Sequence, residues 1–204
     1  APVPNNGSAF APNMIAMALW LGAVMSVYLF NMQRLSEEHA QAPALAKSLG
    51  RYAVPALLVL LQTLLTVLVL CFGLGVVVSD PFSFSLIMLA AGQAFLALVL
   101  LLLRAFGEVG KLIVILLLTL QLAAGGGVMP IELTADFFQA VHDWLPFTWV
   151  IKALRASLFG AYDSGWLLVW LDVVLIGLGA LLLSSLVRPW KTVPARDYRA
   201  AVEV

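Results

Sequence analysis

Residues 112–160, LIVILLLTLQLAAGGGVMPIELTADFFQAVHDWLPFTWVIKALRASLFG, decide how this chain folds. The stretch begins as an apolar run suited to a membrane and is then interrupted by three glycines and Pro130. Two shorter segments follow, separated by Pro146, and each carries apolar residues along one helical face. A simple membrane anchor needs only the span and not the two amphipathic segments after it. The stretch therefore predicts a span followed by a re-entrant or interfacial helical hairpin.

Both predicted hairpin segments are too short to cross a bilayer, so we expect them to dip into or lie on the outer leaflet. Thr134 is the expected N-cap of the first segment, and the glycines allow another backbone to come close. A flexible linker followed by one interfacial helix is the alternative. The residues that define the hairpin are Gly125, Gly126, Gly127, Pro130, Phe137, Phe138, Leu145, Pro146 and Arg155. The predicted apolar faces are Phe137, Phe138, Val141, Trp144 and Leu145, then Phe147, Val150, Ile151, Leu154 and Leu158.

The composition places the whole chain in a membrane. Of 204 residues, 63% are hydrophobic and 11% are charged, and the mean hydropathy is +1.03. Soluble domains average about 45–50% apolar and about 25% charged residues, so membrane lipid must cover this surface. The formal net charge is zero, which argues against a nucleic-acid partner.

Five runs are long enough to cross the roughly 30 Å hydrocarbon core as helices. They are Ala11–Phe30, Tyr52–Val78, Phe84–Leu103, Leu112–Met129 and Trp166–Leu186. The predicted class is all-α, a polytopic membrane bundle of five transmembrane helices with the hairpin before the last. We expect residues 11–187 to form the transmembrane domain and residues 188–204 a cytoplasmic tail. Residues 1–10 are expected to be an extracytoplasmic linker whose upstream part is missing.

Loop charges predict the orientation, because basic residues gather on the cytoplasmic side of membrane proteins. Only Lys152 and Arg155 lie on the predicted outer side. The N-terminus is therefore expected outside and the C-terminus inside. The basic residues on the other side are Arg34, Lys47, Arg51, Arg104, Lys111, Arg188, Lys191, Arg196 and Arg199.

Several polar residues interrupt the spans, and they have two interpretations. They either hydrogen-bond between neighbouring helices or line a substrate path. Asp172 is the one acid within a span, so it is either a working acid or a residue that reaches the outer interface. The candidate path residues are Gln62, Thr66, Gln93, Thr119, Gln121 and Asp172.

The sequence contains no recognisable catalytic motif. The chain lacks the Gly-x-x-x-x-Gly-Lys-Ser/Thr phosphate-binding loop, a nucleophile elbow and a His-Glu-x-x-His zinc motif. His142 has no second histidine or cysteine nearby, which predicts a surface histidine and argues against a metal site. We therefore expect a transporter-type domain that is not an enzyme and binds no cofactor itself.

The sequence order resembles a known family. Gln121–Leu133, Phe137–Ala140, Leu145–Trp149 and Ala153–Arg155, with Leu19–Ala23 in the first span, resemble the end of the YhgE/Pip (phage infection protein) family. That family belongs to the membrane domains of type-2 ABC exporters. The resemblance implies an additional span and a large extracytoplasmic region upstream, a bacterial cytoplasmic membrane, and two bundles facing each other as a homodimer or heterodimer. It also implies hairpin helices that cap the path from outside.

The resemblance further implies that the loop at residues 32–51 docks on a separate ATPase, which would bind and hydrolyse ATP. From its own residues, the loop reads as a short charged helix capped by Ser36, and a solvated connector is the alternative. The candidate coupling residues are Arg34, Glu37, Glu38, His39, Lys47 and Arg51.

Three functions remain open at this point. The first is a permease subunit that moves an amphiphilic, lipid-like or polypeptide substrate outward. The second is a non-transporting scaffold that anchors a large extracytoplasmic domain, such as a phage receptor or a secretion-apparatus component. The third is a proton-coupled carrier, which needs acids in the spans and has only Asp172.

Overall fold

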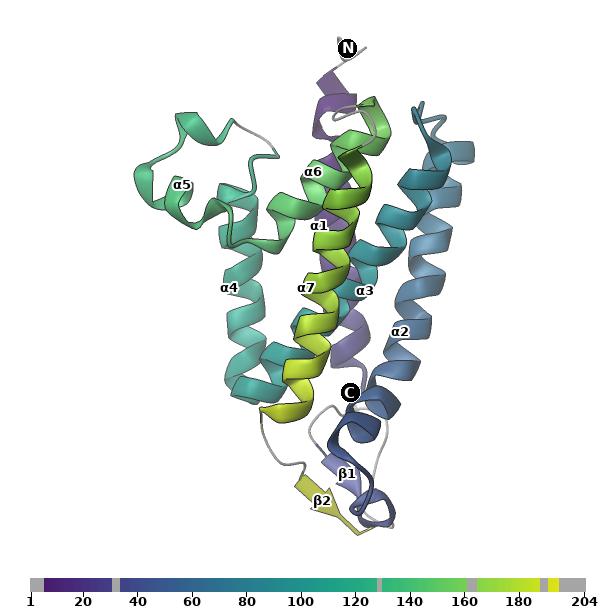
Figure 1. The fold of residues 1–204 in the computed structure, drawn as a ribbon, viewed down its shortest axis with the longest axis vertical. Helices are drawn as coiled ribbons and strands as arrows, with labels where there is room; N and C mark the ends of the chain where they lie inside the picture. Colours follow the sequence, from purple (N-terminus) through teal and green to yellow (C-terminus); the bar gives the residue numbers. More distant parts are fainter. Residues whose placement is uncertain (1–5, 31–33, 128–129, 161–164, 188–190, 195–204) are drawn as a thin grey trace.

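The computed structural model describes residues 6–30, 34–127, 130–160, 165–187 and 191–194. Within these residues the chain is almost entirely helical (Figure 1). The long helices are α1 (Asn6–Tyr28), α2 (Ala44–Leu68), α3 (Pro81–Phe106), α4 (Glu108–Ala124) and α7 (Trp166–Leu186). The remaining elements are α5 (Asp136–His142), α6 (Pro146–Phe159), the strands β1 (Arg34–Ser36) and β2 (Lys191–Val193), and the short helical turns η1 (Glu37–His39), η2 (Val69–Gly73) and η3 (Ile131–Leu133).

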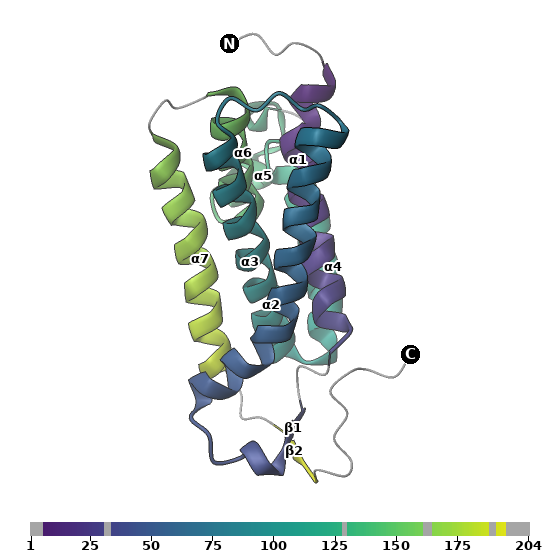
Figure 2. The ribbon, with the colours of Figure 1, turned by 90° about the vertical axis from the view of Figure 1, so that its right-hand side faces the viewer.

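The five long helices run along one axis, and the two ends of the bundle differ (Figures 1 and 2). One end carries β1 and β2 and is called the strand end below. The other end carries α5 and α6 and is called the hairpin end. Helix α3 lies at the centre, where it packs against α1, α2, α4, α6 and α7. This central place explains why small and apolar residues on almost every side of α3 are buried.

Local sequence signals place both ends of α3. The Asp80 carboxylate accepts hydrogen bonds from the backbone N–H groups of Phe82 and Ser83, at 3.1 and 3.3 Å, and Pro81 occupies the first helical turn. Gly107 ends the helix with a φ of +64°, a conformation that favours glycine. Because Gly107 is the single residue between α3 and α4, the two helices lie side by side as an antiparallel pair.

The predicted count of five spans is not confirmed. Among the described residues, four helices are long and apolar enough to cross a membrane: Phe10–Tyr28, Ala44–Gly73, Pro81–Phe106 and Trp166–Leu186. The predicted fourth span, Leu112–Met129, is instead α4, which has 17 residues and ends at Ala124. At 1.5 Å per residue it is about 26 Å long, slightly less than the hydrocarbon core. The helix stops because Gly126 adopts a φ of +66° directly after Gly125.

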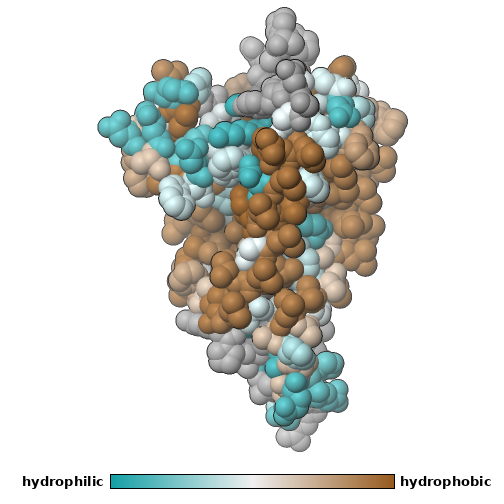
Figure 3. Space-filling view, viewed as in Figure 1, coloured by the Kyte–Doolittle hydropathy of each residue, from teal (hydrophilic) through white to brown (hydrophobic). Residues whose placement is uncertain are grey.

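Leucine-rich faces of α2 and α7 point away from the protein. Each of these two spans is 17% buried, against 56% and 61% for the spans of α1 and α3. Figure 3 shows the apolar surface as a continuous band over α7, between hydrophilic surfaces at both ends. An apolar patch of this extent indicates contact with lipid. The chain is therefore a multi-pass membrane protein.

The strand end contains a pairing that the sequence did not predict. Strand β1, in the loop between α1 and α2, pairs in parallel with β2, which follows α7. Leu35 aligns with Thr192, and the Leu35 side chain is buried. The predicted loop helix is present only as the three-residue turn η1. Ser36 precedes it, but its side chain makes no capping hydrogen bond.

Candidate functional site

The hairpin end is built around Pro146, where the chain breaks as predicted. Helix α5 ends at His142 and α6 begins at Pro146, with proline in its first turn. The N–H of Phe147 donates to Gln121 Oε1 on α4 at 3.3 Å. At the other end of α6, the carbonyls of Ser157 and Leu158 accept from Asp80 and Ser79 of the α2–α3 loop. Helix α6 therefore crosses the bundle from the end of α4 to the start of α3 (Figure 1).

The apolar stripe of α6 has the predicted residues but a different partner. Phe147, Val150, Ile151, Leu154 and Leu158 are all buried, and they join the protein core. The predicted position in or on the outer leaflet left the partner of this stripe open, and that partner is protein. Protein surrounds α6 on most sides, because the small residues off the stripe, Ala153, Ala156 and Ser157, are buried as well.

Helix α5 shows the opposite pattern. Of its predicted apolar face, Phe137 is 60% exposed and Trp144 is 87% exposed, whereas Leu145 is buried. The predicted single face is therefore split, because the helix ends at His142 and residues beyond it no longer follow helical periodicity. Thr134 is not the N-cap. Its hydroxyl donates to the Ile131 carbonyl, and Ala135 precedes the helix.

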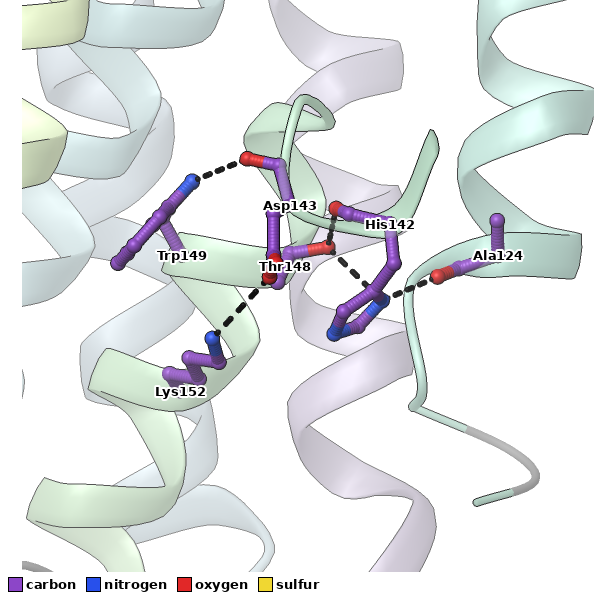
Figure 4. Close-up of polar contacts among 6 residues, drawn as sticks. All are labelled: Ala124, His142, Asp143, Thr148, Trp149 and Lys152. Carbon is purple, nitrogen blue, oxygen red and sulfur yellow. Dashed lines mark hydrogen bonds and ion pairs between the residues drawn. The ribbon is translucent and has the colours of Figure 1, made fainter. Parts of the chain in front are cut away.

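A polar clasp ties α4, α5 and α6 together (Figure 4). His142 Nδ1 lies 2.5 Å from the carbonyl oxygen of Ala124, the last residue of α4. Because a carbonyl can only accept, Nδ1 carries the proton. The Thr148 hydroxyl donates to the His142 carbonyl at 2.5 Å. The predicted surface histidine is therefore partly buried and holds the hairpin on the end of α4. Among the described residues, no group of three or more His, Cys, Asp and Glu side chains could hold a metal.

Four further contacts support the elbow at Pro146. Trp149 Nε1 donates to the Asp143 carbonyl at 3.0 Å. Lys152 Nζ lies 3.8 Å from the Asp143 carboxylate and 4.6 Å from the centre of the Trp149 ring (Figure 4). Arg155 Nη2 donates to the Gly126 carbonyl at 2.8 Å, so Arg155 stabilises the glycine turn that ends α4.

An aromatic cluster lies beneath α6. The Phe147 ring is 6.0 Å from the Trp20 ring of α1 and 5.3 Å from the Phe95 ring of α3. Trp20, Phe95 and Gln121 are each essentially inaccessible to solvent. We call these three residues the socket of Phe147. Sequence reasoning did not assign Trp20 or Phe95 a site, because an aromatic residue in an apolar run carries no signal of which helix it meets.

The structure distributes the candidate path residues over separate interfaces. Gln62 Nε2 donates to the Ala18 carbonyl across α1 and α2, at 3.4 Å. Gln93 bonds Tyr52 and the Ala56 carbonyl across α2 and α3. These two glutamines therefore act as helix–helix contacts. Thr66 and Thr119 bond carbonyls of their own helices, Gln121 lies in the socket, and Asp172 is half-buried on α7.

At the strand end, the candidate coupling loop forms a cavity of about 500 Å³. Lys47 Nζ donates to the Ala40 carbonyl and Arg51 Nη2 to the Arg34 carbonyl, both at 2.6 Å, so the start of α2 holds the loop. Four of the six predicted coupling residues line the cavity, whereas Arg34 and Glu37 do not. The lining residues are Leu35, Ser36, Glu38, His39, Ala42, Ala46, Lys47, Gly50 and Arg51.

Cysteine labelling tests the difference between α5 and α6. In a Cys71→Ser background, we expect Trp144→Cys to react quickly with a bulky water-soluble maleimide and Ile151→Cys to remain unmodified. Trp144 is 87% exposed and Ile151 is 1% exposed. Labelling in intact membranes, followed by a gel-shift assay, measures the two rates. Rapid modification of Ile151→Cys would contradict the buried position of α6.

Comparison with known proteins now adds to this geometry. The family described as "ABC-2 type transporter" matches residues 5–159, which include α1 to α6, the hairpin and the strand-end cavity. This chain belongs to that family. ABC-2 members are membrane domains of transporters, and the resemblance to the YhgE/Pip-like branch is confirmed by a relative. "Uncharacterized protein YhgE" of Bacillus subtilis (strain 168) is 30% identical over 183 residues.

The matched region covers 89% of this chain and 23% of the Bacillus protein. The chain thus spans about a quarter of the length of the curated relative it matches. No solved structure matches the chain.

Proposed function

We propose that this ABC-2 membrane domain is the permease subunit of an exporter that moves an amphiphilic, lipid-like or polypeptide substrate outward. A separate ATPase would provide the energy, and ATP would bind to that subunit only. The observation that carries this proposal is the different construction of the two ends of the bundle. One end presents a cavity whose lining includes charged residues of the loop and of the start of α2, and the other presents a hinged helix over an aromatic socket.

The strand end would face the cytoplasm of a bacterial cell, in the cytoplasmic membrane. Basic residues support this orientation, because Lys47, Arg51, Arg104 and Lys111 lie toward the strand end of their helices and only Lys152 and Arg155 belong to α6. The start of α1 would then be outside and β2 inside. With α4 counted as a short span, the bundle would have five transmembrane helices.

The hairpin would be re-entrant in the outer leaflet. Helix α4 ends before the other long helices, and α6 starts beside that end and returns to the start of α3. The chain would thus turn back within the outer half of the bundle. The exposed Trp144 and Phe137 suit the membrane interface, where aromatic residues are enriched.

The cavity at the strand end would receive the ATPase. Glu38, His39, Lys47 and Arg51 present both signs of charge around it. Strand β2, which follows α7, pairs with β1 of the candidate coupling loop, so a force on the loop would reach the last helix. Two copies, or this chain and a homologue, would enclose the path.

Replacing Glu37, Glu38 and His39 together with alanine tests this docking. We expect an unchanged protein level, because all three side chains are exposed, and loss of the associated ATPase activity. The measurement is ATP hydrolysis by complexes purified from native membranes through a tag on the full-length protein.

A matched control replaces three exposed residues at the hairpin end, Glu132, Asp136 and Gln139, which should keep the hydrolysis. The docking proposal fails if the loop variant retains full ATPase activity. Absence of any nucleotide-dependent partner in the unaltered protein would instead favour the membrane scaffold. That second function is favoured by one observation, the small share of the Bacillus protein that this domain covers.

A further inference from the structure

The socket beneath α6 contains two buried hydrogen-bond donors that lack an acceptor. Within the part of the chain that the structure describes, Trp20 Nε1 and Gln121 Nε2 have no hydrogen-bond partner, although both side chains are fully buried. Buried polar atoms in proteins are nearly always paired, so each exception needs an explanation. Packing alone does not require a tryptophan and a glutamine here, since phenylalanine and leucine would fill similar space without the cost.

The two unpaired groups flank the same side chain. The Phe147 ring packs edge-on against the Trp20 indole, with ring centres 6.0 Å apart and planes at 77°. The backbone N–H of Phe147 donates to Gln121 Oε1. This bond sets the orientation of the amide, so that Nε2 is the atom left over. Both Trp20 Nε1 and Gln121 Nε2 are donors, and an acceptor is what the socket lacks.

Phe147 is held by an element that has its own hinge. Pro146 precedes it and removes one backbone donor from the elbow. Gly125 lies directly against Phe147, since a Cβ there would be in contact with Phe147 Cβ at 3.4 Å, and it would clash with the Gln121 carbonyl oxygen of α4 at 2.5 Å. The ring offers these donors no lone pair, and its face can give at most the weaker N–H···π contact.

We propose that Trp20, Phe95 and Gln121 form a binding site for the carbonyl-bearing apolar part of an amphiphile, such as an acyl ester or amide, and that Phe147 fills this site in the present state. The aromatic rings of Trp20 and Phe95 hold the apolar group, and an unpaired donor, Trp20 Nε1 or Gln121 Nε2, binds the carbonyl oxygen. This inference rests on the proposed transport function, because only a transporter would carry the bound amphiphile as its substrate. It names the chemical class of the substrate, which the family does not.

Removing the Phe147 ring tests the site without transport. In purified Phe147→Ala, we compare the dissociation constants of acetophenone and ethylbenzene, which have similar shapes and differ in the carbonyl. A carbonyl bonded to otherwise unpaired donors should favour acetophenone by about tenfold. The control cavity is Phe84→Ala, a buried phenylalanine on the same helix as Phe95 and about 16 Å away along it. Comparing the two cavities cancels the different partitioning of the probes into detergent.

The expected result is an acetophenone preference about tenfold larger in Phe147→Ala than in Phe84→Ala. Adding Trp20→Phe or Gln121→Leu to Phe147→Ala should reduce that preference, and the unaltered protein should bind both probes more weakly. Equal preferences in the two cavities would overturn the proposal. If Phe147→Ala does not fold, Phe147→Leu leaves a smaller cavity for the same comparison with the smaller pair acetone and propane. The acetophenone preference does not depend on an ATPase. If the coupling-loop variant disproved the ATPase proposal, the binding result would still stand, so the two proposals can fail separately.

Discussion

Trp20→Ala is expected to lower the free energy of unfolding by about 3 kcal/mol. The Trp20 ring is fully buried and packs against Phe95 at 5.2 Å and Phe147 at 6.0 Å between ring centres. Replacing a buried tryptophan with alanine typically costs about 3–5 kcal/mol in a water-soluble core. In lipid the transfer contribution is weaker, whereas the lost van der Waals contacts and the cavity remain, so we expect the lower part of that range.

Unfolding in mixed micelles of increasing denaturing detergent measures this change. The control is Trp144→Ala, which removes an equally large side chain that is 87% exposed. That variant should stay within about 0.5 kcal/mol of the unaltered protein. Similar losses in both variants would show that α1 and α6 do not share a packed core.

Gly177→Leu is expected to separate α7 from α3. A Cβ at Gly177 would lie 2.9 Å from Ala94 Cα and 3.1 Å from Ala94 Cβ. Backbone cannot move aside as a side chain can, so the helices must part. Overpacking usually costs about 1–3 kcal/mol, and leucine at a backbone contact should lie at the upper end of that range. We expect loss of folded protein in the same detergent titration and a lower yield of monodisperse protein.

Gly179 provides the matched control on the same helix. A Cβ there meets no atom within 4 Å, so Gly179→Leu adds an apolar side chain that faces lipid. It should leave stability unchanged or raise it slightly, because leucine favours the helix more than glycine. If Gly177→Leu and Gly179→Leu unfold at the same detergent fraction, the close α3–α7 contact is absent.

The sequence predicted most of the hairpin and only part of its environment. The break at Pro146 and the apolar stripe from Phe147 to Leu158 followed from local composition and period, and both are present. The partner of the stripe did not follow, however, and the structure packs it against other helices, including α1 and α3. Lipid tails and a protein core are equally apolar, so periodicity identifies the buried face and not the material that covers it.

His142 shows a second limit. Its partner is the backbone carbonyl of Ala124, 18 residues earlier in the chain. Every residue has a backbone carbonyl, so the sequence cannot show which carbonyl a side chain will bond. A single histidine therefore gave no reason to expect this hydrogen bond. The glutamines differ, because Gln62 and Gln93 bond across helices. That was one of the two interpretations that their positions in apolar runs allowed.

The sequence by itself determined the membrane class, the helical runs, and the breaks at residues 125–127 and at Pro146. These features depend on apolar length and on the backbone limits of glycine and proline, which act within a few residues. Only the tertiary structure decided that α6 lies inside the bundle, that β2 pairs with β1, and that Trp20 and Gln121 meet around Phe147. Those contacts join residues far apart in the chain, and their geometry depends on how whole helices pack together.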